Sequence, residues 1–189
     1  MSRKAKDLNA KKENDLNSKK PHDCIIAFDN GVTGAVAICN TDNLLSFNLS
    51  KDYTKKELSY TKIKKNITRI DAPKLQTLIG QSLSTAKNPI AIIERPMVNP
   101  TRFVASCSAL RALEATLIVL ESFNIPVVYC DSKEWQHKLF GKSAIGDTKE
   151  NSKKLGLELY PQFADNINKQ DADALLILYW FKQREGLND

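Results

Sequence analysis

An apolar run at residues 24–28 stops at a single charge, Asp29, and a second apolar run follows at residues 35–39. Both runs are short and rich in β-branched residues, which predicts two buried strands. The residues between them include Gly31 and Gly34, which favour a tight reversal. The pattern therefore predicts a hairpin with a carboxylate at the end of its first strand. Asp29 is then either a surface residue that begins a turn or a metal ligand held on a central strand.

The remaining apolar segments alternate between strands and helices. Short apolar runs predict strands at residues 44–49, 90–93 and 127–130, and residues 161–169 are expected to be a polar connection. Helical spacing predicts helices at 71–85, at 103–123, after residue 131, from residue 147 or 148, and at 171–180. This order predicts an α/β fold: a mixed central sheet that begins as an antiparallel meander, with helices on both faces.

Charge divides the 189-residue chain into an arm and one domain. Residues 1–20 carry seven lysines and arginines against three acidic residues, so we expect a disordered basic arm, followed by a domain at 21–189. The net charge of +6 favours a polyanionic partner such as nucleic acid. The arm either binds phosphates or only aids solubility. A second lysine-rich stretch, residues 51–69, is either a nucleic-acid backbone contact or a solvated loop or edge strand.

The positions of the cysteines and histidines indicate the redox compartment and the kind of metal site that the chain could have. The four cysteines lie far apart in apolar runs, which is typical of thiols in a reducing, cytoplasmic compartment. His22 and His137 have no partner at ligand spacing, so carboxylates must hold any metal, which favours Mg²⁺ or Mn²⁺. We find no apolar run long enough to span a bilayer and expect no membrane partner.

Four carboxylates, at the ends of two strands and the start of the last helix, are candidates for such a metal site. Asp29 and Glu94 each end an apolar strand, and parallel neighbouring strands would bring both to one sheet edge. Asp171 and Asp173 begin the last predicted helix. Two divalent ions held by converging carboxylates can serve both oxygens of a phosphodiester displacement.

Over residues 25–181 the chain resembles the RuvC-like Holliday junction resolvases of the RNase H-like superfamily. The resemblance lies in a first strand that ends in Asp, the Gly-containing turn that follows it, and the order of strands and helices. In that family two aspartates commonly stand three apart at the start of the last helix. Here Gln170 occupies the first position, and Asp171 is about 200° from Asp173 on an ideal helix. Asp171 can share a metal with Asp173 if it lies just before the helix, in extended conformation. The alternative is that Asp171 is merely the N-cap, which bonds the backbone N–H of Asp173 or Ala174.

The resemblance also implies a basic residue near the scissile phosphate, which Lys149 provides in the first turn of its helix. Nucleic-acid contacts are expected from Asn99, Arg102, Lys153 and Lys154. The helix at 103–123 is apolar on more than one face, and in the family such a helix supports a homodimer.

These features predict a metal-dependent endonuclease that resolves branched DNA, such as a four-way junction, by paired nicking. One alternative is a nucleic-acid-binding module with a degraded catalytic site, which Gln170 favours. Another is a phosphotransferase related to sugar kinases, whose first strand also ends in Asp-x-Gly. Such folds need two of these domains and a second glycine-rich phosphate turn, and this chain lacks both the length and the second turn.

Overall fold

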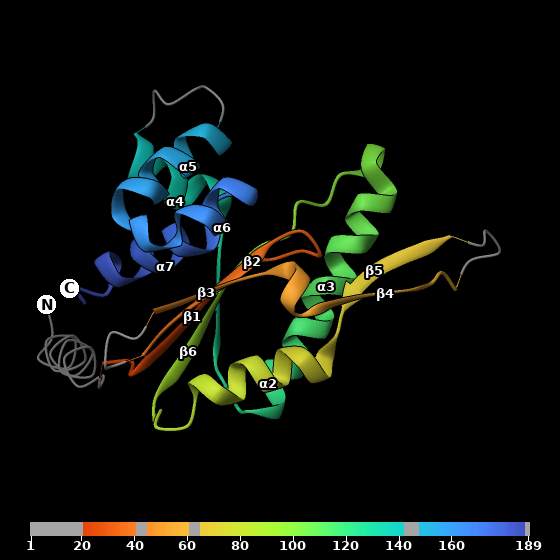
Figure 1. Ribbon diagram of the computed structural model, residues 1–189, viewed down its shortest axis with the longest axis horizontal. Helices are drawn as coiled ribbons and strands as arrows, with labels where there is room; N and C mark the ends of the chain where they lie inside the picture. Colours follow the sequence, from red (N-terminus) through yellow and green to blue (C-terminus); the bar gives the residue numbers. More distant parts are fainter. Residues whose placement is uncertain (1–20, 41–44, 61–64, 142–147, 188–189) are drawn as a thin grey trace, which may run out of the picture.

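The computed structural model describes residues 21–40, 45–60, 65–141 and 148–187, shown in Figure 1. The predicted basic arm at 1–20 lies outside these residues, and so does Asp147. Helix and strand labels follow Figure 1.

A five-stranded mixed sheet forms the centre of the molecule, in the order β3-β2-β1-β6-β7. Its strands are β1 (Cys24–Asp29), β2 (Ala35–Asn40), β3 (Leu45–Leu49), β6 (Pro89–Glu94) and β7 (Val127–Cys130). The first three pair antiparallel, whereas β6 is parallel to both β1 and β7. The predicted meander and the interior position of the 90–93 strand are therefore confirmed.

Helices cover both faces of this sheet (Figure 1). One face carries α2 (Ala72–Ser82) and α3 (Phe103–Ser122), and the other carries α4 (Ser132–Phe140), α5 (Thr148–Leu159), α6 (Ala164–Lys169) and α7 (Asp173–Arg184). Short 3₁₀ turns lie at Ser50–Asp52, Pro100–Arg102 and Pro161–Phe163. The predicted fold class, a mixed sheet with helices on both faces, is confirmed.

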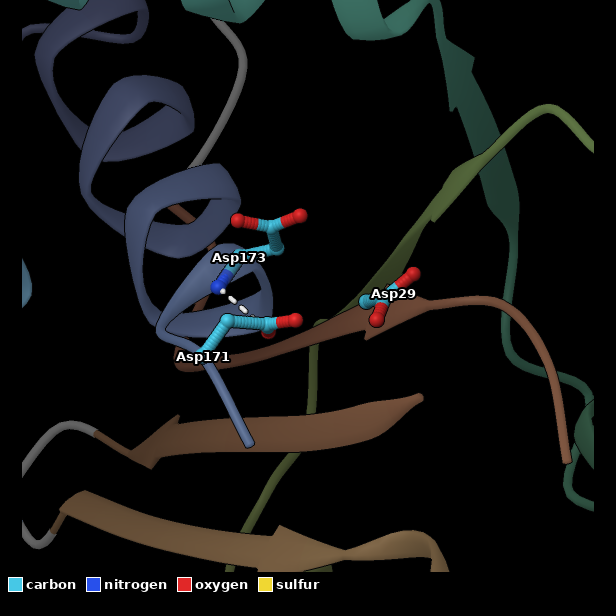
Figure 2. A group of neighbouring side chains, drawn as sticks. All are labelled: Asp29, Asp171 and Asp173. Carbon is cyan, nitrogen blue, oxygen red and sulfur yellow. Dashed lines mark hydrogen bonds between the residues drawn. The ribbon is translucent and has the colours of Figure 1, made fainter. Parts of the chain in front are cut away.

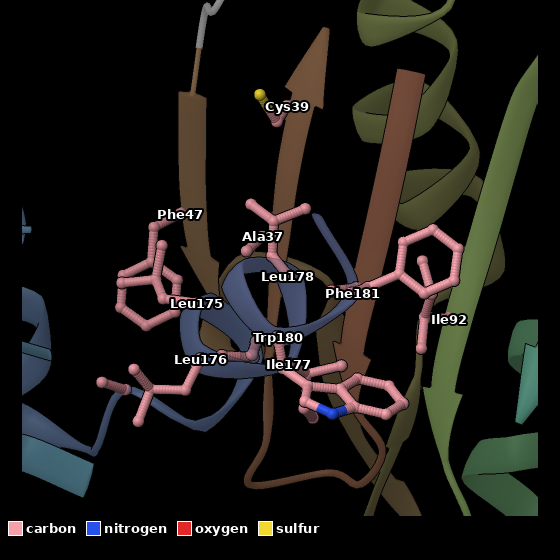
Figure 3. Close-up of a cluster of buried hydrophobic side chains, with 14 of the residues drawn as sticks. Ala37, Cys39, Phe47, Ile92, Leu175, Leu176, Ile177, Leu178, Trp180 and Phe181 are labelled. Carbon is pink, nitrogen blue, oxygen red and sulfur yellow. The ribbon is translucent and has the colours of Figure 1, made fainter. Parts of the chain in front are cut away.

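The side chains of β1 alternate between the two cores, because successive strand residues point to opposite faces. Ile25 and Ala27 pack with α7, and Ile26 and Phe28 pack with α2 and α3. On the α7 side, buried residues from Leu175 to Phe181 lie against the sheet (Figure 3). A strand buried on both faces is rigid, so β1 holds Asp29, the residue at its end, in a fixed position.

The structure corrects three details of the predicted elements. The lysine-rich stretch contains two strands, β4 (Thr54–Leu58) and β5 (Asn66–Ile70), which form a separate antiparallel sheet. The predicted polar connection at 161–169 is wrong, because it contains a 3₁₀ turn and α6. The last helix begins at Asp173 and continues to Arg184, so residues 171 and 172 precede it.

The β4–β5 hairpin projects past α3, away from the main sheet (Figure 1). Its base is fixed by the buried residues Tyr53 and Ile70 and by the Asp71 N–H, which donates to the Tyr53 carbonyl at 2.9 Å. Further out, the exposed Tyr60 hydroxyl accepts a hydrogen bond of 2.7 Å from Arg111 of α3. The base of the hairpin is therefore part of the core beside α2 and α3, and Arg111 holds its outer part to α3.

α3 is apolar on its outer side as well as on the side that faces the core. Ala112, Val119 and Leu120 are buried in the core, while Val104 is 81% exposed and Ile118 is 56% exposed. By length and composition alone, the helical segment Pro100–Ser122 is apolar enough to cross a membrane, because an 18-residue window within it has a mean hydropathy of 1.7. The prediction that no apolar run is that long is therefore wrong, although core helices pass the same test.

Candidate metal centre

Strand register brings Asp29 and Glu94 to the same edge and the same face of the sheet. Phe28 lies opposite Ile93 in the parallel pair β1–β6, so the next residue of each strand is a carboxylate. Every second residue of a strand points to the same face. Asp29 is therefore on the face of Ile25 and Ala27, and Glu94 is on the face of Ile90 and Ile92, which pack in the α7 core. Both side chains therefore point to the face that carries α7.

The start of α7 brings two further carboxylates to Asp29. One carboxylate oxygen from each of Asp29, Asp171 and Asp173 lies within 4.8 Å of the others, as Figure 2 shows. Asp171 precedes the helix, and its Oδ1 accepts a hydrogen bond of 3.3 Å from the Asp173 N–H. The N-cap of α7 is Ala172, so the alternative that Asp171 is the N-cap is wrong, although its carboxylate bonds the backbone of the first helical turn. Asp171 precedes the helix, as sharing a metal with Asp173 requires.

The turn after β1 fits closely around Asp29. A Cβ atom at Gly34 would overlap the Asp29 carbonyl oxygen and lie 3.1 Å from its Oδ2, so only glycine allows this approach. The side chain of Asn30 donates to the Ala109 carbonyl of α3 at 3.3 Å. The turn is therefore held between the sheet and α3, which fixes the position of Asp29.

The carboxylates raise one another's pKa. Burial, with the charges of Asp173, Asp171 and Glu94, raises the pKa of Asp29 well above its ordinary value. Burial and Asp171 raise the pKa of Asp173 to about 6. Burial, opposed by a hydrogen bond from Trp135, raises the pKa of Glu94 to about 7. The site concentrates negative charge that a cation would neutralise.

Two residues that the sequence did not single out hold these carboxylates. The buried indole of Trp135, on α4, donates to Glu94 Oε2 at 3.1 Å. The buried hydroxyl of Ser152, on α5, donates to Asp173 Oδ1. Both residues lie on helices that contact the α7 face of the sheet. They are 41 and 21 positions from their partners, so no local sequence signal could have found them.

The predicted basic and polar residues occupy different places around the site. Lys149 lies in the first turn of α5, and its charge lowers the pKa of Asp29 and of Asp173. Asn99 and Arg102 line a pocket of about 230 Å³ together with Asp29 and Glu94. Lys153 instead donates to the Asn168 carbonyl at 3.3 Å, and Lys154 is exposed. Lys149, Asn99 and Arg102 are thus beside the carboxylates, while the Lys153 ammonium is bonded to α6.

The donor set fits a hard divalent cation. Mg²⁺ and Mn²⁺ prefer oxygen ligands, and three carboxylates converge here without histidine or cysteine. Asp29, Asp171 and Asp173 would hold such an ion, with Glu94 beside them on the same sheet edge. The residues present therefore suit the cofactor that the sequence predicts.

The arrangement of strands and helices defines the class of fold. A mixed sheet with an antiparallel start and helices on both faces matches the RuvC/RNase H-like α/β fold.

Known structures with this fold include RuvC. The chain is similar to T. thermophilus RuvC in complex with a Holliday junction substrate, with 13% identity over 88% of this chain and 98% of that chain, and a TM-score of 0.51. A second T. thermophilus RuvC structure matches with 13% identity over 87% and 97% of the two chains and a TM-score of 0.49. No protein family model and no curated protein sequence matches the chain.

Proposed function

We propose that the protein is a divalent-metal-dependent endonuclease that cuts branched DNA, with the four-way junction as its substrate class. The observation that carries this proposal is the group of Asp29, Asp171 and Asp173, which joins the end of the central strand to the start of α7. A partly buried acidic cluster at this edge suits phosphodiester chemistry better than nucleic-acid binding alone, because without a cation it would repel a phosphate.

The chain's residues divide the work of phosphodiester hydrolysis. Mg²⁺ or Mn²⁺, when bound, would polarise a phosphoryl oxygen of the substrate and activate a water. Asp29, Asp171 and Asp173 would hold the cation, and Glu94 would contribute from the adjacent strand end. Lys149, near these carboxylates at a helix N-terminus, stabilises the negative charge of the scissile phosphate.

Affinity for DNA comes from basic and polar groups outside the carboxylate cluster. Asn99 and Arg102 line the pocket beside Asp29 and are placed to contact the backbone. The β4–β5 hairpin adds the exposed Lys56 and Lys65 at a distance from the site. Contacts of this kind are insensitive to base sequence and strongly dependent on salt.

Paired nicking requires two sites, and we propose that α3 joins two copies of the chain. The outer side of α3 exposes Phe103, Val104, Leu110 and Ile118, and Phe103 is 72% exposed. Exposed apolar residues along one helix mark an interaction surface. A strictly monomeric mass at micromolar concentration, together with full junction cutting, would overturn the dimer.

The test is incubation with labelled four-way junction, linear duplex and RNA–DNA hybrid in Mg²⁺, Mn²⁺ or EDTA. We expect cutting of the junction with either metal and none in EDTA. Asp29→Asn, Glu94→Gln and Asp173→Asn should each abolish cutting and preserve or tighten junction binding, since each removes a negative charge near the DNA phosphate. Glu158→Gln, an exposed position on α5, is the matched control. Normal cutting by Asp29→Asn would refute the assignment.

A second candidate function is a DNA-binding module whose catalytic site has degraded. Gln170 favours it, since this residue stands where RuvC-like enzymes carry an aspartate. The same incubation separates the two functions. Tight junction binding without metal-dependent cutting, unchanged in Asp29→Asn, would support the module and exclude the nuclease.

A further inference from the structure

The hydroxyl of Ser152 connects α5 to the start of α7. Its Oγ donates to Asp173 Oδ1 and accepts a hydrogen bond of 3.3 Å from the Ala172 N–H. Ser152 is fully buried, so water does not compete for either bond. One hydroxyl therefore fixes both the side chain of Asp173 and the backbone that precedes it.

Gly156 lies one helical turn after Ser152 on the same face of α5, and it is also buried. A Cβ atom at Gly156 would overlap the Cβ of Ala172 and lie 3.6 Å from Ile167 Cδ1. α5 therefore approaches the residue before Asp173 as closely as a glycine permits. This close approach brings the Ser152 hydroxyl within reach of Asp173.

The hydrogen bond restricts a side chain that is otherwise free to rotate. The terminal torsion of an aspartate is broad and roughly two-fold, so an unrestrained carboxylate samples many orientations. The bond to Oδ1 restricts this torsion while one oxygen of the same carboxylate lies within 4.8 Å of the Asp29 and Asp171 oxygens. Preset orientation of a ligand lowers the entropy lost when an ion binds.

We propose that Ser152 is a positioning residue that presets Asp173 to bind the divalent cation, and that Gly156 permits the approach that this requires. The inference rests on the proposed metal-dependent function and assigns a role that the four carboxylates do not fill. It predicts that losing the hydroxyl weakens metal binding while the acidic residues themselves remain.

The first test measures Mn²⁺ binding by calorimetry with the full chain of wild type, Ser152→Ala and Ser82→Ala. Ser82, whose hydroxyl donates to Leu78 within α2, is the matched control for loss of a serine hydroxyl. We expect Ser152→Ala to bind Mn²⁺ at least about tenfold more weakly, the range found when partners of metal ligands are removed. Ser82→Ala should bind like wild type.

Cleavage supplies a second readout that a merely structural role would not change. Ser152→Ala should need a higher Mg²⁺ concentration for half-maximal junction cutting, and saturating Mg²⁺ should restore most of the rate. Urea unfolding in EDTA reports separately on the stability of the fold. Lower stability with unchanged metal affinity and unchanged Mg²⁺ dependence would overturn the positioning role.

The Gly156 contact is tested by exchanging the two side chains that meet. Gly156→Ala should weaken Mn²⁺ binding, because the added methyl pushes α5 away from Ala172. The double variant Gly156→Ala/Ala172→Gly removes the opposing methyl and should recover affinity. Equal Mn²⁺ affinity in wild type and Gly156→Ala would overturn this part.

The outcomes separate the inference from the function on which it rests. A wild-type chain that binds no Mn²⁺ and cuts no junction overturns the proposed nuclease and this inference with it. A wild-type chain that binds Mn²⁺, lost in Asp173→Asn but kept at full affinity in Ser152→Ala, overturns the inference alone.

Discussion

Replacing Glu94 by glutamine should stabilise the metal-free protein at alkaline pH. The pKa of Glu94 is raised from 4.5 to about 7, chiefly by burial. A pKa difference of one corresponds to about 1.4 kcal/mol, so the charged carboxylate destabilises the fold by about 3 kcal/mol at pH 8. Glutamine removes the charge and keeps an oxygen that can accept the Trp135 hydrogen bond.

The sign of the pH dependence follows from the direction of this shift. Below pH 4.5 the carboxyl is protonated in both the folded and unfolded states, and Glu94 contributes no pH-dependent cost. Between pH 4.5 and 7 the folded protein holds the proton more tightly, so stability falls as pH rises, and above pH 7 the full cost is present. At pH 5 the cost is only about 1 kcal/mol.

Urea unfolding in EDTA at pH 5 and pH 8 measures this effect. With a urea dependence of about 3 kcal/mol per molar, Glu94→Gln should raise the unfolding midpoint by about 1 M at pH 8 and by much less at pH 5. Glu158→Gln, at an exposed glutamate of α5, should shift neither midpoint appreciably. The reasoning is refuted if Glu94→Gln is no more stable than wild type at pH 8, or if its gain is equal at both pH values.

Three further predictions concern the support of the site and the basic arm. Trp135→Phe keeps the aromatic packing but removes the indole donor, so cutting at limiting Mg²⁺ should fall about tenfold; an unchanged Mg²⁺ titration would contradict this. Asp171→Asn still accepts the hydrogen bond from the Asp173 N–H and loses a charge that repels Asp29, so its melting temperature in EDTA should be no lower than wild type while cutting is lost. Retained cutting would reduce Asp171 to a backbone contact at the start of α7. Removal of residues 1–20 should preserve cutting but weaken junction binding at moderate salt, and an unchanged salt slope would reduce the arm to a solubility tail.

Much of the central sheet could be predicted because its strands obey simple rules. β1 and β2 are short apolar runs separated by glycines, and Glu94 stands at an abrupt end of an apolar strand. These signals depend only on neighbouring residues, so the sequence placed both strand-end carboxylates correctly on the sheet.

Other features could not be predicted from the sequence, because they depend on contacts between distant residues or on where a helix begins to within one or two residues. The role of Asp171 depends on whether the last helix begins at 171 or 173, and helix boundaries are poorly specified by pattern. The strands of the β4–β5 hairpin are mostly polar and their few apolar residues do not alternate with polar ones, so no period of two marked them. Trp135 and Ser152 reach the site only through the packing of α4 and α5.

The acidic group connects the two elements that also share the largest hydrophobic cluster, β1 and α7. Repulsion between Asp29 and the aspartates at 171 and 173 therefore acts to separate the same surfaces that the packing of Leu175 and Phe181 holds together. A cation between the aspartates would reverse that force and act as a cross-link between strand and helix. Ion loading and global stability are then thermodynamically coupled, and the protein should resist heat and proteolysis better in Mg²⁺ than in EDTA.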